Sequence, residues 1–273
     1  MPQTYRQINR EVMTDTKRQY ESLPELQEAV RQSVAKQFMV AHEDKIALPE
    51  LPKRTTQYVI SGKRSFEAAK GYAGKKVAVL NFANNHNVGG APFSAGAQEE
   101  SLCRCSTLYP CIQAMWKPFY QKHKRQFDAH EIGYMGNDDL IYTPDVVVFK
   151  TDERADTIYP KMMPQKEWYK VDVITCAAPE LFRMRTVPAD YEAQIASRIR
   201  KILDVAALQG VEVLILGAWG CGAFRNPSEV VARVFRTLLQ NYHFDIVEFA
   251  LATRGDLKDN AFGRALEMNA SRR

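Results

Sequence analysis

Two stretches of the sequence have the composition of anion-binding loops. The first contains Gly89 and Gly90 followed by Ala91, and the second contains the run Gly220-Cys221-Gly222-Ala223-Phe224. Small residues let backbone N–H groups approach a ligand closely, and such groups before a helix attract phosphate. Neither stretch has the spacing of a dinucleotide fingerprint or the Lys-Ser/Thr ending of a P-loop. One glycine loop is common in proteins, but two on one sheet predict a phosphate-bearing ligand.

The first stretch ends in two adjacent carboxylates, Glu99 and Glu100, which follow Gln98. We expect a helix to begin here, because its dipole favours a carboxylate in the first turn by about 0.3–1 kcal/mol. Acidic residues occur at helix starts for that reason alone, but beside a phosphate loop the pair predicts general acid–base chemistry. Successive helical residues diverge by about 100°. We therefore expect one glutamate to face the loop and the other to face sideways.

Short apolar, β-branched runs predict the strands that position these loops. They are residues 76–82, 145–150, 171–177, 211–216 and 246–251. Between the last three lie apolar stripes at helical spacing, the second of them opened by Asn226-Pro227-Ser228-Glu229, in which we expect Asn226 to cap the helix. Alternating strands and helices predict an α/β fold with a largely parallel sheet. Such sheets bind ligands beyond the carboxyl ends of their strands.

The amino-terminal part has a different pattern. Apolar residues recur at spacings of three, four and eight through residues 5–43, which predicts helices, with Asn9 as a weak cap. Residues 48–53 carry two prolines, which is typical of a connection. We therefore expect residues 1–53 to form a helical extension packed on the core and residues 54–273 to form the main domain.

The composition excludes several classes of protein. The 273 residues are 45% apolar and 25% charged, unlike collagen-like, disordered or disulfide-framework chains. No apolar run reaches about 18 residues, and residues 1–23 lack the apolar core of a signal peptide, so we expect a cytoplasmic protein that does not bind membranes. The net charge of +5 fits an anionic ligand, but no block of like charges predicts specific nucleic-acid binding.

Five cysteines, an odd number without a Cys-x-x-Cys pair, predict reduced thiols rather than disulfides. A metal site built from Cys103, Cys105 and His86 is conceivable. Their spacing is not that of a metal-ligand set, however, and we expect neither a metal nor a cofactor.

The residues around the first loop resemble those of a known family. The string LNFANNHNVGGAPFSAGAQEESLCRCSTLYP is similar to the signature of microbial-type poly(ADP-ribose) glycohydrolases, a branch of the macrodomain superfamily. That signature has a triple glycine, a short spacer and then Gln-Glu-Glu. Further similarities lie in residues 142–149, 171–179 and 217–224, so the resemblance runs from about residue 75 to about residue 260.

The resemblance implies a macrodomain-like three-layer α/β/α sandwich with a mixed, largely parallel sheet. It implies a hydrolase that cleaves ribose–ribose O-glycosidic bonds in poly(ADP-ribose), on modified proteins, and releases ADP-ribose. Glu100 would be the catalytic residue, and Glu99 would hold a ribose hydroxyl or position Glu100. Asn81 and Asn84 would contact the distal ribose. The remaining substrate-binding residues would be Gly89, Gly90, Ala91, Gln98, Gly220, Cys221, Gly222, Ala223 and Phe224, with Phe224 packing on the distal ribose.

Two positions depart from the family pattern. Ala91 stands where a third glycine is expected, and alanine costs about 1 kcal/mol if that position needs a positive φ. Glu180 stands where asparagine is expected, which changes the charge near the predicted pocket.

These departures leave other functions open. The chain could hydrolyse mono-ADP-ribosyl adducts on protein, nucleic acid or small molecules, it could be a non-catalytic ADP-ribose-binding module, or it could be an unrelated phosphate-binding module. The intact Gln98-Glu99-Glu100 favours an enzyme, because binding alone does not need a paired acid.

Overall fold

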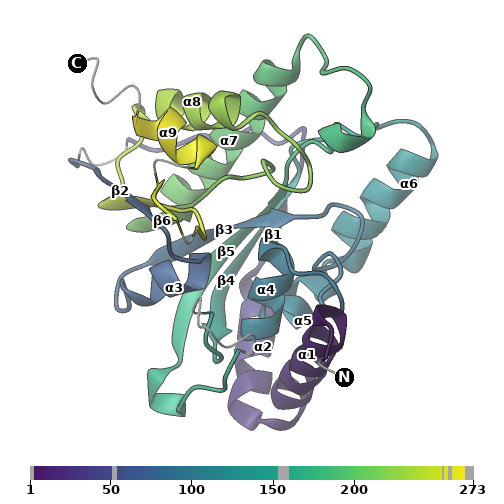
Figure 1. The fold of residues 1–273 in the computed structure, drawn as a ribbon, viewed down its shortest axis with the longest axis vertical. Coiled ribbons are helices and arrows are strands. Elements are labelled where there is room, and N and C mark those ends of the chain that lie inside the picture. The colour runs from purple at the N-terminus through teal and green to yellow at the C-terminus, as the bar shows by residue number, and fades with distance from the viewer. Residues whose placement is uncertain (1–2, 51–53, 153–159, 254, 258–259, 268–273) are drawn as a thin grey trace.

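The computed structural model describes residues 3–50, 54–152, 160–253, 255–257 and 260–267. Within them, seven strands form one sheet in the order β1-β4-β5-β3-β6-β7-β2 (Figure 1). The strands from β5 to β2 in that order are parallel, whereas β4 and β1 are antiparallel to their neighbours. The sheet is therefore mixed and largely parallel, as predicted. The strands are β1 (Phe38–Val40), β2 (Gln57–Ser61), β3 (Val77–Ala83), β4 (Leu140–Val148), β5 (Tyr169–Ala177), β6 (Val213–Leu216) and β7 (Ile246–Ala250).

The five predicted strands are present, but β4 begins five residues before the predicted start. Pro144 interrupts its apolar pattern, and the register shifts between Thr143 and Val146, where Asp145 has a φ of +57°. The two strands at the sheet edges, β1 and β2, were not predicted. They are short, and no residue of β2 is fully buried, so neither has the apolar run of a central strand.

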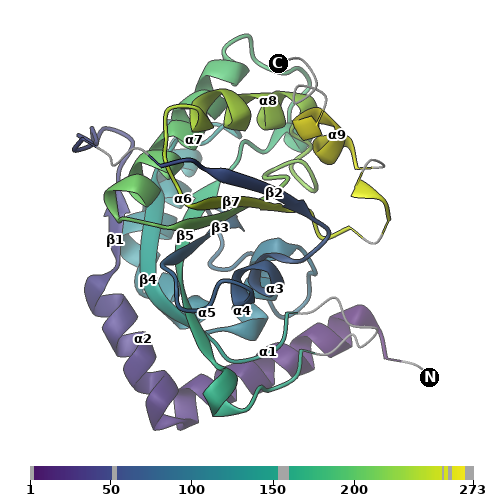
Figure 2. The ribbon, with the colours of Figure 1, turned by 90° about the vertical axis from the view of Figure 1, so that its left-hand side faces the viewer.

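Helices cover both faces of the sheet, which gives the three layers (Figures 1 and 2). One face carries α7 (Tyr191–Leu208), α8 (Ser228–Leu239) and α9 (Ala261–Glu267), and the other carries α3 (Ser65–Lys70), α4 (Gln98–Cys105) and α5 (Leu108–Ala114). A π-helical turn over Trp116–Gln121 leads into α6 (Lys122–Asp128). Single 3₁₀ turns occur at Gln165–Glu167 and Leu181–Arg183.

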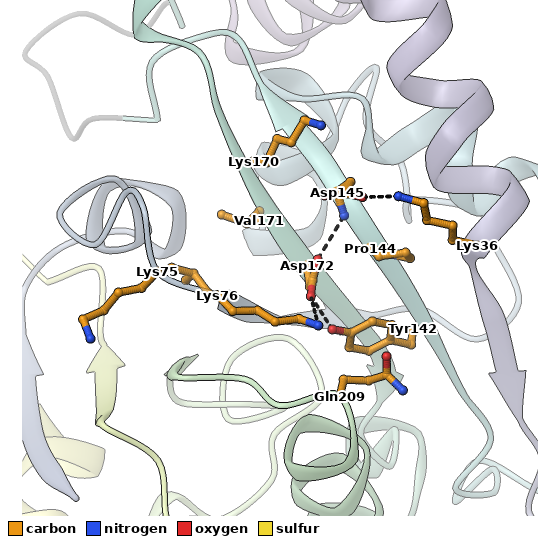
Figure 3. A pocket seen from close by; sticks show the side chains of 11 residues that line it. Lys36, Lys75, Lys76, Tyr142, Pro144, Asp145, Lys170, Val171, Asp172 and Gln209 are labelled. Carbon is orange, nitrogen blue, oxygen red and sulfur yellow. Dashed lines mark hydrogen bonds and ion pairs between the residues drawn. The ribbon is translucent and has the colours of Figure 1, made fainter.

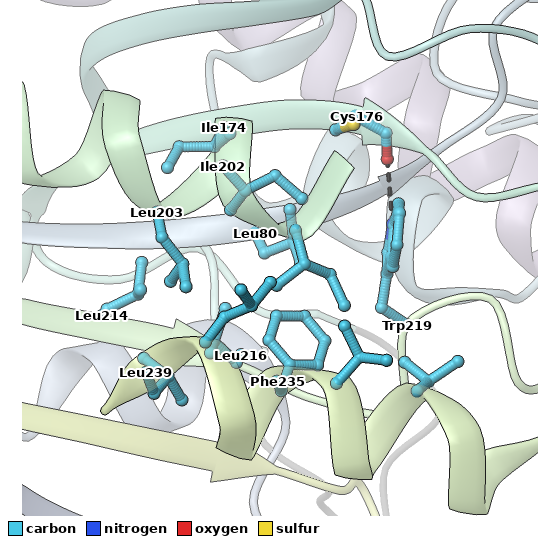
Figure 4. Packing of buried hydrophobic residues seen from close by; sticks show 14 of the residues in the cluster. Leu80, Ile174, Cys176, Ile202, Leu203, Leu214, Leu216, Trp219, Phe235 and Leu239 are labelled. Atoms are coloured by element: carbon cyan, nitrogen blue, oxygen red, sulfur yellow. Dashed lines mark hydrogen bonds between the residues drawn. The ribbon is translucent and has the colours of Figure 1, made fainter. Parts of the chain in front are cut away.

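Successive residues of the central strands point to opposite faces of the sheet, so each strand contributes to the core on both sides. In β3, Leu80 packs with the α7–α8 side, whereas Val79 packs with the α3–α5 side. Trp219 belongs to the core on the α7–α8 side and donates its indole N–H to the Cys176 carbonyl at 3.0 Å (Figure 4). The carboxyl ends of the parallel strands are thereby fixed relative to one another.

The amino-terminal residues form helices as predicted as far as Lys36, but the prediction for residues 5–43 was wrong at its carboxyl end, where residues 38–40 form strand β1. Two helices, α1 (Tyr5–Ser22) and α2 (Pro24–Lys36), are separated by Leu23, which is extended because it precedes a proline. Thr4 rather than Asn9 caps α1. After α2 the chain enters the sheet as β1. The predicted domain boundary at residue 53 lies outside the described residues.

Polar contacts bind these two helices to the sheet. Lys150, which is 2% exposed, donates from Nζ to Asp15 at 2.6 Å and to the Thr16 hydroxyl at 2.8 Å. On α2, Lys36 pairs with Asp145 at 2.8 Å. A buried ammonium is stable only when it is paired and hydrogen-bonded, so the α1 contact fixes that helix in place.

Three negative findings concern the described part of the chain. No helix there is long and apolar enough to cross a membrane. All five cysteines are unpaired, and only Cys221 among them is not fully buried. No cluster of three or more His, Cys, Asp or Glu residues in those ranges is placed to hold a metal ion.

Asp139, at the loop that enters β4, gives a pH-dependent test of the fold. Burial alone would raise the pKa of this carboxyl, but contacts with His123 and Lys122, each at 3.0 Å, outweigh it and lower the pKa to about 2. The unfolded value is near 3.8. The stabilisation is therefore complete above the unfolded pKa and is lost as the pH falls towards 2.

We expect Asp139→Asn to lower the free energy of unfolding by about 2 kcal/mol at pH 7 and by much less at pH 2–3. Denaturant unfolding at pH 7, 5, 4 and 3 measures the difference. Asp128→Asn, an exposed change on the adjacent helix, is the control and should change stability little at any pH. Equal destabilisation by Asp139→Asn at pH 7 and pH 3 would contradict this assignment.

Candidate active site

The predicted loops meet in one cleft at the carboxyl ends of β3 and β6. The cleft has a volume of about 380 Å³ and lies between the start of α4 and the residues that follow β6. It is lined by both glutamates and by parts of both loops: Phe82, Ala83, Asn84, Gly90, Ala97, Gln98, Glu99, Glu100, Ala178, Ala218, Trp219, Gly220, Gly222, Ala223 and Phe224.

Glu99 is almost completely buried and is held by two donors from β3 and its loop. The backbone N–H of Asn84 donates to Oε2 at 2.8 Å, and the Asn81 amide donates to Oε1 at 3.2 Å. Burial raises the pKa of Glu99 well above its usual range; the Asn84 and Asn81 hydrogen bonds oppose the rise, and the neighbouring Glu100 adds to it. This carboxyl therefore keeps its proton to a higher pH than an exposed glutamate does.

Glu100 has one oxygen fixed and one free. Its Oε1 accepts a hydrogen bond from the Ala91 N–H at 3.1 Å, whereas its Oε2 is buried and makes no hydrogen bond within the described chain. The side chain is 7% exposed and lines the cleft. An unsatisfied buried oxygen costs about 1–3 kcal/mol. It is therefore poised to gain a hydrogen-bonding partner from a ligand.

The two glutamates do not diverge as the sequence predicted. A Cβ atom on Gly90 would lie 2.4 Å from Oε1 of Glu100 and 3.2 Å from Oε2 of Glu99. Both carboxylates therefore face the first loop, since it curls over the start of α4 and both side chains are long enough to bend towards it. The prediction that one glutamate faces sideways was wrong.

Ala91 occupies an ordinary backbone conformation. Gly89 and Gly90 have φ values of +64° and +66°, but Ala91 is not among the described residues with positive φ. It is exposed, and its N–H is the group that holds Glu100. The expected cost of alanine at the third glycine position therefore does not arise.

The polar side chains of Gln98, Asn81 and Asn84 make hydrogen bonds that hold the site together. Gln98 accepts from the Phe82 N–H at 2.9 Å and donates to the Leu80 carbonyl at 2.8 Å, which fastens α4 to β3. Asn81 is completely buried, while Asn84 accepts from two backbone N–H groups of its own loop. These positioning roles were not predicted, and direct contact with substrate stays a prediction for all three.

Helix α1 braces the first loop from outside, which the sequence did not indicate. Asn9 donates from its side chain to the carbonyls of Ser94 and Ala95 at 3.2 and 3.0 Å. Arg104 of α4 also donates to Ala95, at 2.7 Å, and Thr16 of α1 donates to the Arg104 carbonyl at 2.6 Å. The sequence does place two polar residues, Asn9 and Thr16, seven positions apart on one helical face, and both are buried. That spacing could have indicated that this face packs against the rest of the chain.

The second loop is held by Asn226, and this corrects the predicted helix cap. Helix α8 begins at Ser228, and the Asn226 side chain donates instead to the carbonyls of Pro179 and Gly220, both at 2.9 Å. Gly220 has a φ of +72°, and a Cβ there would lie 2.6 Å from the Asn226 amide nitrogen. Asn226 therefore fixes the turn that presents the loop.

The two loops use the backbone N–H groups nearest the cleft differently. In the first, the N–H of Gly90 donates to Asn87 and that of Ala91 to Glu100. In the second, the N–H groups of Gly222, Ala223 and Phe224 make no hydrogen bond within the described chain. Free N–H groups in a small-residue loop attract anions, so the second loop is a candidate for holding phosphate.

Cys221 lies in the second loop but has no features of a reactive thiol. Its Sγ lies 3.5 Å from the Trp219 carbonyl oxygen, and burial raises its pKa to about 11. The thiol therefore stays protonated near neutral pH, and the backbone N–H of Cys221 already donates to the Ala218 carbonyl at 3.1 Å.

A second cavity of similar volume lies at the other end of the central strands, near the amino ends of β3 and β5 (Figure 3). Lysines line it, but Lys36 is paired with Asp145, Lys76 lies 3.9 Å from Asp172, and Lys75 and Lys170 point away from its centre. The lysines do not converge on one point. This cavity therefore lacks the arrangement of an anion site.

Comparison with known proteins assigns the fold and the cleft to a family. The model of the microbial-type PARG catalytic domain matches residues 3–151, and the chain belongs to that family. PARG is poly(ADP-ribose) glycohydrolase, and the chain has the macrodomain-like architecture that the sequence predicted. No match was found among curated proteins.

Solved structures of this family resemble nearly the whole chain. Poly(ADP-ribose) glycohydrolase from Thermomonospora curvata is 28% identical, with a TM-score of 0.79, over 95% of this chain and 98% of that one. The same protein bound to the inhibitor ADP-HPD gives a TM-score of 0.75 at 28% identity, over 96% and 98% of the two chains. The Deinococcus radiodurans enzyme in complex with ADP-ribose is 27% identical, with a TM-score of 0.73, over 92% and 98%.

The space left by Gly90 gives a test of how the acid pair is held. We expect Gly90→Ala to destabilise the protein by about 2–4 kcal/mol, because it combines a positive φ with a Cβ that meets Glu100. Gly210→Ala, with the same φ but open space around it, should cost only about 1 kcal/mol. Denaturant unfolding compares the two.

The neighbouring change Ala91→Gly is the second control. Because Ala91 needs no positive φ, glycine there should lower stability by no more than about 1 kcal/mol. Equal effects of Gly90→Ala and Gly210→Ala, or stabilisation by Ala91→Gly, would show that the contact with Glu100 does not govern this loop.

Proposed function

We propose that this chain is a poly(ADP-ribose) glycohydrolase that hydrolyses the O-glycosidic bond between ribose units and releases ADP-ribose. The observation that carries the proposal is the free Oε2 of Glu100, buried in a cleft next to a loop with unpaired N–H groups. Membership of the family and the likeness to a relative solved with ADP-ribose support it.

Glu100 is the proposed general acid and base. Breaking an acetal requires a proton on the departing ribose oxygen, and it passes through an oxocarbenium-like state. Protonated Glu100 would give its proton to that oxygen as the C1–O bond breaks. Water would then add to C1 and return a proton to Glu100, so the products are free ADP-ribose and a shortened polymer.

Glu99 is the proposed neighbour that orients the reacting sugar. Its two oxygens accept from Asn84 and Asn81, so it cannot swing away from Glu100. A raised pKa lets it keep a proton and offer a hydrogen bond to a ribose hydroxyl. In this proposal Asn81 and Asn84 act on the distal ribose mainly through Glu99.

The loops are proposed to bind the diphosphate and the distal ribose. The free N–H groups of the second loop would hold the diphosphate, and the half-buried ring of Phe224 would pack on the ribose. The backbone of Gly89, Gly90 and Ala91 would form the opposite wall, with Gln98 beneath it. Binding energy from these remote groups would orient the anomeric carbon.

An adjoining cavity is proposed to take the adenosine of the departing ADP-ribose. It has a volume of about 350 Å³ and shares Phe82, Ala97, Gln98 and Ala218 with the cleft. Arg64 and Ser65 line its far wall, and the Arg64 Nε lies 3.1 Å from Asp152. A nucleoside joined to the diphosphate would enter here without leaving the carboxyl edge of the sheet.

The structure weakens the case for the alternative substrates. Ala91 was the main reason to consider mono-ADP-ribosyl adducts, and it is exposed and unstrained. A pure binding module would not need a second buried carboxylate with a free oxygen. We therefore favour the polymer as substrate.

The remaining proposals concern setting and partners. We propose that the enzyme acts on ADP-ribose polymers attached to proteins, in the cytoplasm, and needs no cofactor, metal, membrane or specific nucleic-acid partner. The unpaired cysteines support a reducing compartment. We also propose that residues 1–53 are an extension that braces the catalytic domain, residues 54–273, through α1.

Replacing the acid separates catalysis from binding. We expect Glu100→Gln to reduce the release of ADP-ribose from the polymer by a factor of about 10²–10⁴, because glutamine has the same shape but no proton to transfer. Chromatography of the released ADP-ribose measures turnover. Calorimetry should find the Kd for ADP-ribose changed by less than about threefold.

Glu229→Gln is the matched control, because Glu229 is an exposed glutamate in the first turn of another helix. It should leave both turnover and binding unchanged. Full turnover by Glu100→Gln would remove Glu100 from the mechanism.

A further inference from the structure

A row of partly exposed rings continues the cleft beyond Phe224. The ring of Phe182 lies nearly parallel to that of Phe224, at 16°, with centroids 6.3 Å apart. The guanidinium carbon of Arg183 lies 4.8 Å from the centroid of the Phe182 ring and 5.7 Å from that of Tyr134. We call Phe224, Phe182, Arg183 and Tyr134 the aromatic ledge.

Two rings of the ledge are exposed to solvent. Phe182 is 41% exposed and Tyr134 is 39% exposed, although such rings contribute most to stability when buried. Arg183 donates from Nε to Glu180 at 3.2 Å, and its terminal amino groups make no hydrogen bond within the described chain. Exposed rings around an immobilised cation are typical of a binding surface.

The ledge lies on the other side of the cleft from the cavity proposed for adenosine. Phe182 donates its backbone N–H to the Phe224 carbonyl at 3.2 Å, so the ledge is joined to the cleft through Phe224, which lines the cleft. It comes from the residues that follow β5 and precede β4, whereas the cavity proposed for adenosine lies towards β7 and β2. A ligand that fills the cleft and that cavity therefore leaves the ledge open to a group attached to C1.

We propose that the aromatic ledge binds the nucleotide of the leaving unit, with an adenine stacked on the exposed rings and its diphosphate paired with Arg183. This inference rests on the proposed function, because in poly(ADP-ribose) the group attached to C1 is the adenosine ribose of another ADP-ribose unit. Bases stack on aromatic side chains, and a guanidinium pairs with phosphate through two hydrogen bonds.

The same assignment gives Glu180 a role. The sequence showed Glu180 as a departure that changes the charge near the pocket, but the structure does not place it among the residues lining the cleft. Its carboxylate instead engages the Arg183 Nε, and its own N–H donates to the Tyr134 carbonyl at 2.9 Å. Glu180 is therefore a positioning residue that orients the ledge.

The test compares two substrates that share the scissile ADP-ribosyl group but differ in the leaving group. One is a defined trimer of ADP-ribose, and the other is an ADP-ribose O-glycoside of a simple phenol. We expect Phe182→Ala and Arg183→Gln to lower kcat/KM on the trimer about tenfold, mainly through KM. Both variants should stay within about twofold of wild type on the phenol glycoside, and Phe182→Trp should restore activity on the trimer.

Arg185→Gln is the matched control, because Arg185 is exposed two residues further on and makes no hydrogen bond or ion pair with another described residue. It should change neither substrate. Unchanged trimer kinetics in both ledge variants, or equal losses on both substrates, would overturn the proposal. Slowing only on a mono-ADP-ribosylated protein would assign the ledge to a protein acceptor and would overturn it too.

The experiment distinguishes an error in the ledge proposal from an error in the proposed function. A wild-type protein that cleaves neither the trimer nor the phenol glycoside contradicts the glycohydrolase assignment. A wild-type protein that cleaves both, with ledge variants that behave like it, contradicts the ledge alone.

Discussion

The cleft depends on packing two buried carboxyl groups against a turn that has no side chain at residue 90. Both Glu99 and Glu100 bend towards that turn, and any Cβ there would overlap an oxygen of Glu100. Burying carboxylates is costly unless donors meet them. Three oxygens of the pair have such donors, and the fourth, Oε2 of Glu100, has none among the described residues. The proposed acid–base chemistry of the site depends on this oxygen, which is free to bond to a ligand.

The two loops consequently do different work. In the first loop the N–H of Gly90 bonds within the loop and that of Ala91 holds Glu100, and the loop is braced from outside by Asn9 and Arg104. The second is held from below by Asn226, which leaves the N–H groups of three residues free for an anion. A carboxyl group held in place on one wall and free backbone N–H groups on the opposite wall fit the proposed hydrolysis of a nucleotide sugar, which requires the substrate to be oriented.

The sequence predicted the parts of this arrangement that local pattern determines. Buried runs marked the central strands, small residues marked the loops, and the dipole argument placed the glutamates in a first turn. It could not predict the convergence of Glu99 and Glu100, because that depends on how the first loop curls back over α4.

Other features depend on contacts between residues far apart in the chain. Asn226 was expected to cap a helix, since Asn-Pro-Ser-Glu is a helix-start signal, but tertiary bonds to Pro179 and Gly220 prevail. Asn9 meets Ala95 across 86 positions, and no local pattern reports such a pair. The edge strands β1 and β2 were missed because they are short and only partly buried.

The most direct measurement is a crystal structure of the Glu100→Gln variant with an uncleaved ADP-ribose trimer. We expect the diphosphate within about 3 Å of the N–H groups of residues 222–224, and the side chain at position 100 within about 3.5 Å of the glycosidic oxygen. A trimer bound elsewhere, or one whose glycosidic oxygen lies well beyond the reach of residue 100, would contradict the assignment of this cleft as the active site.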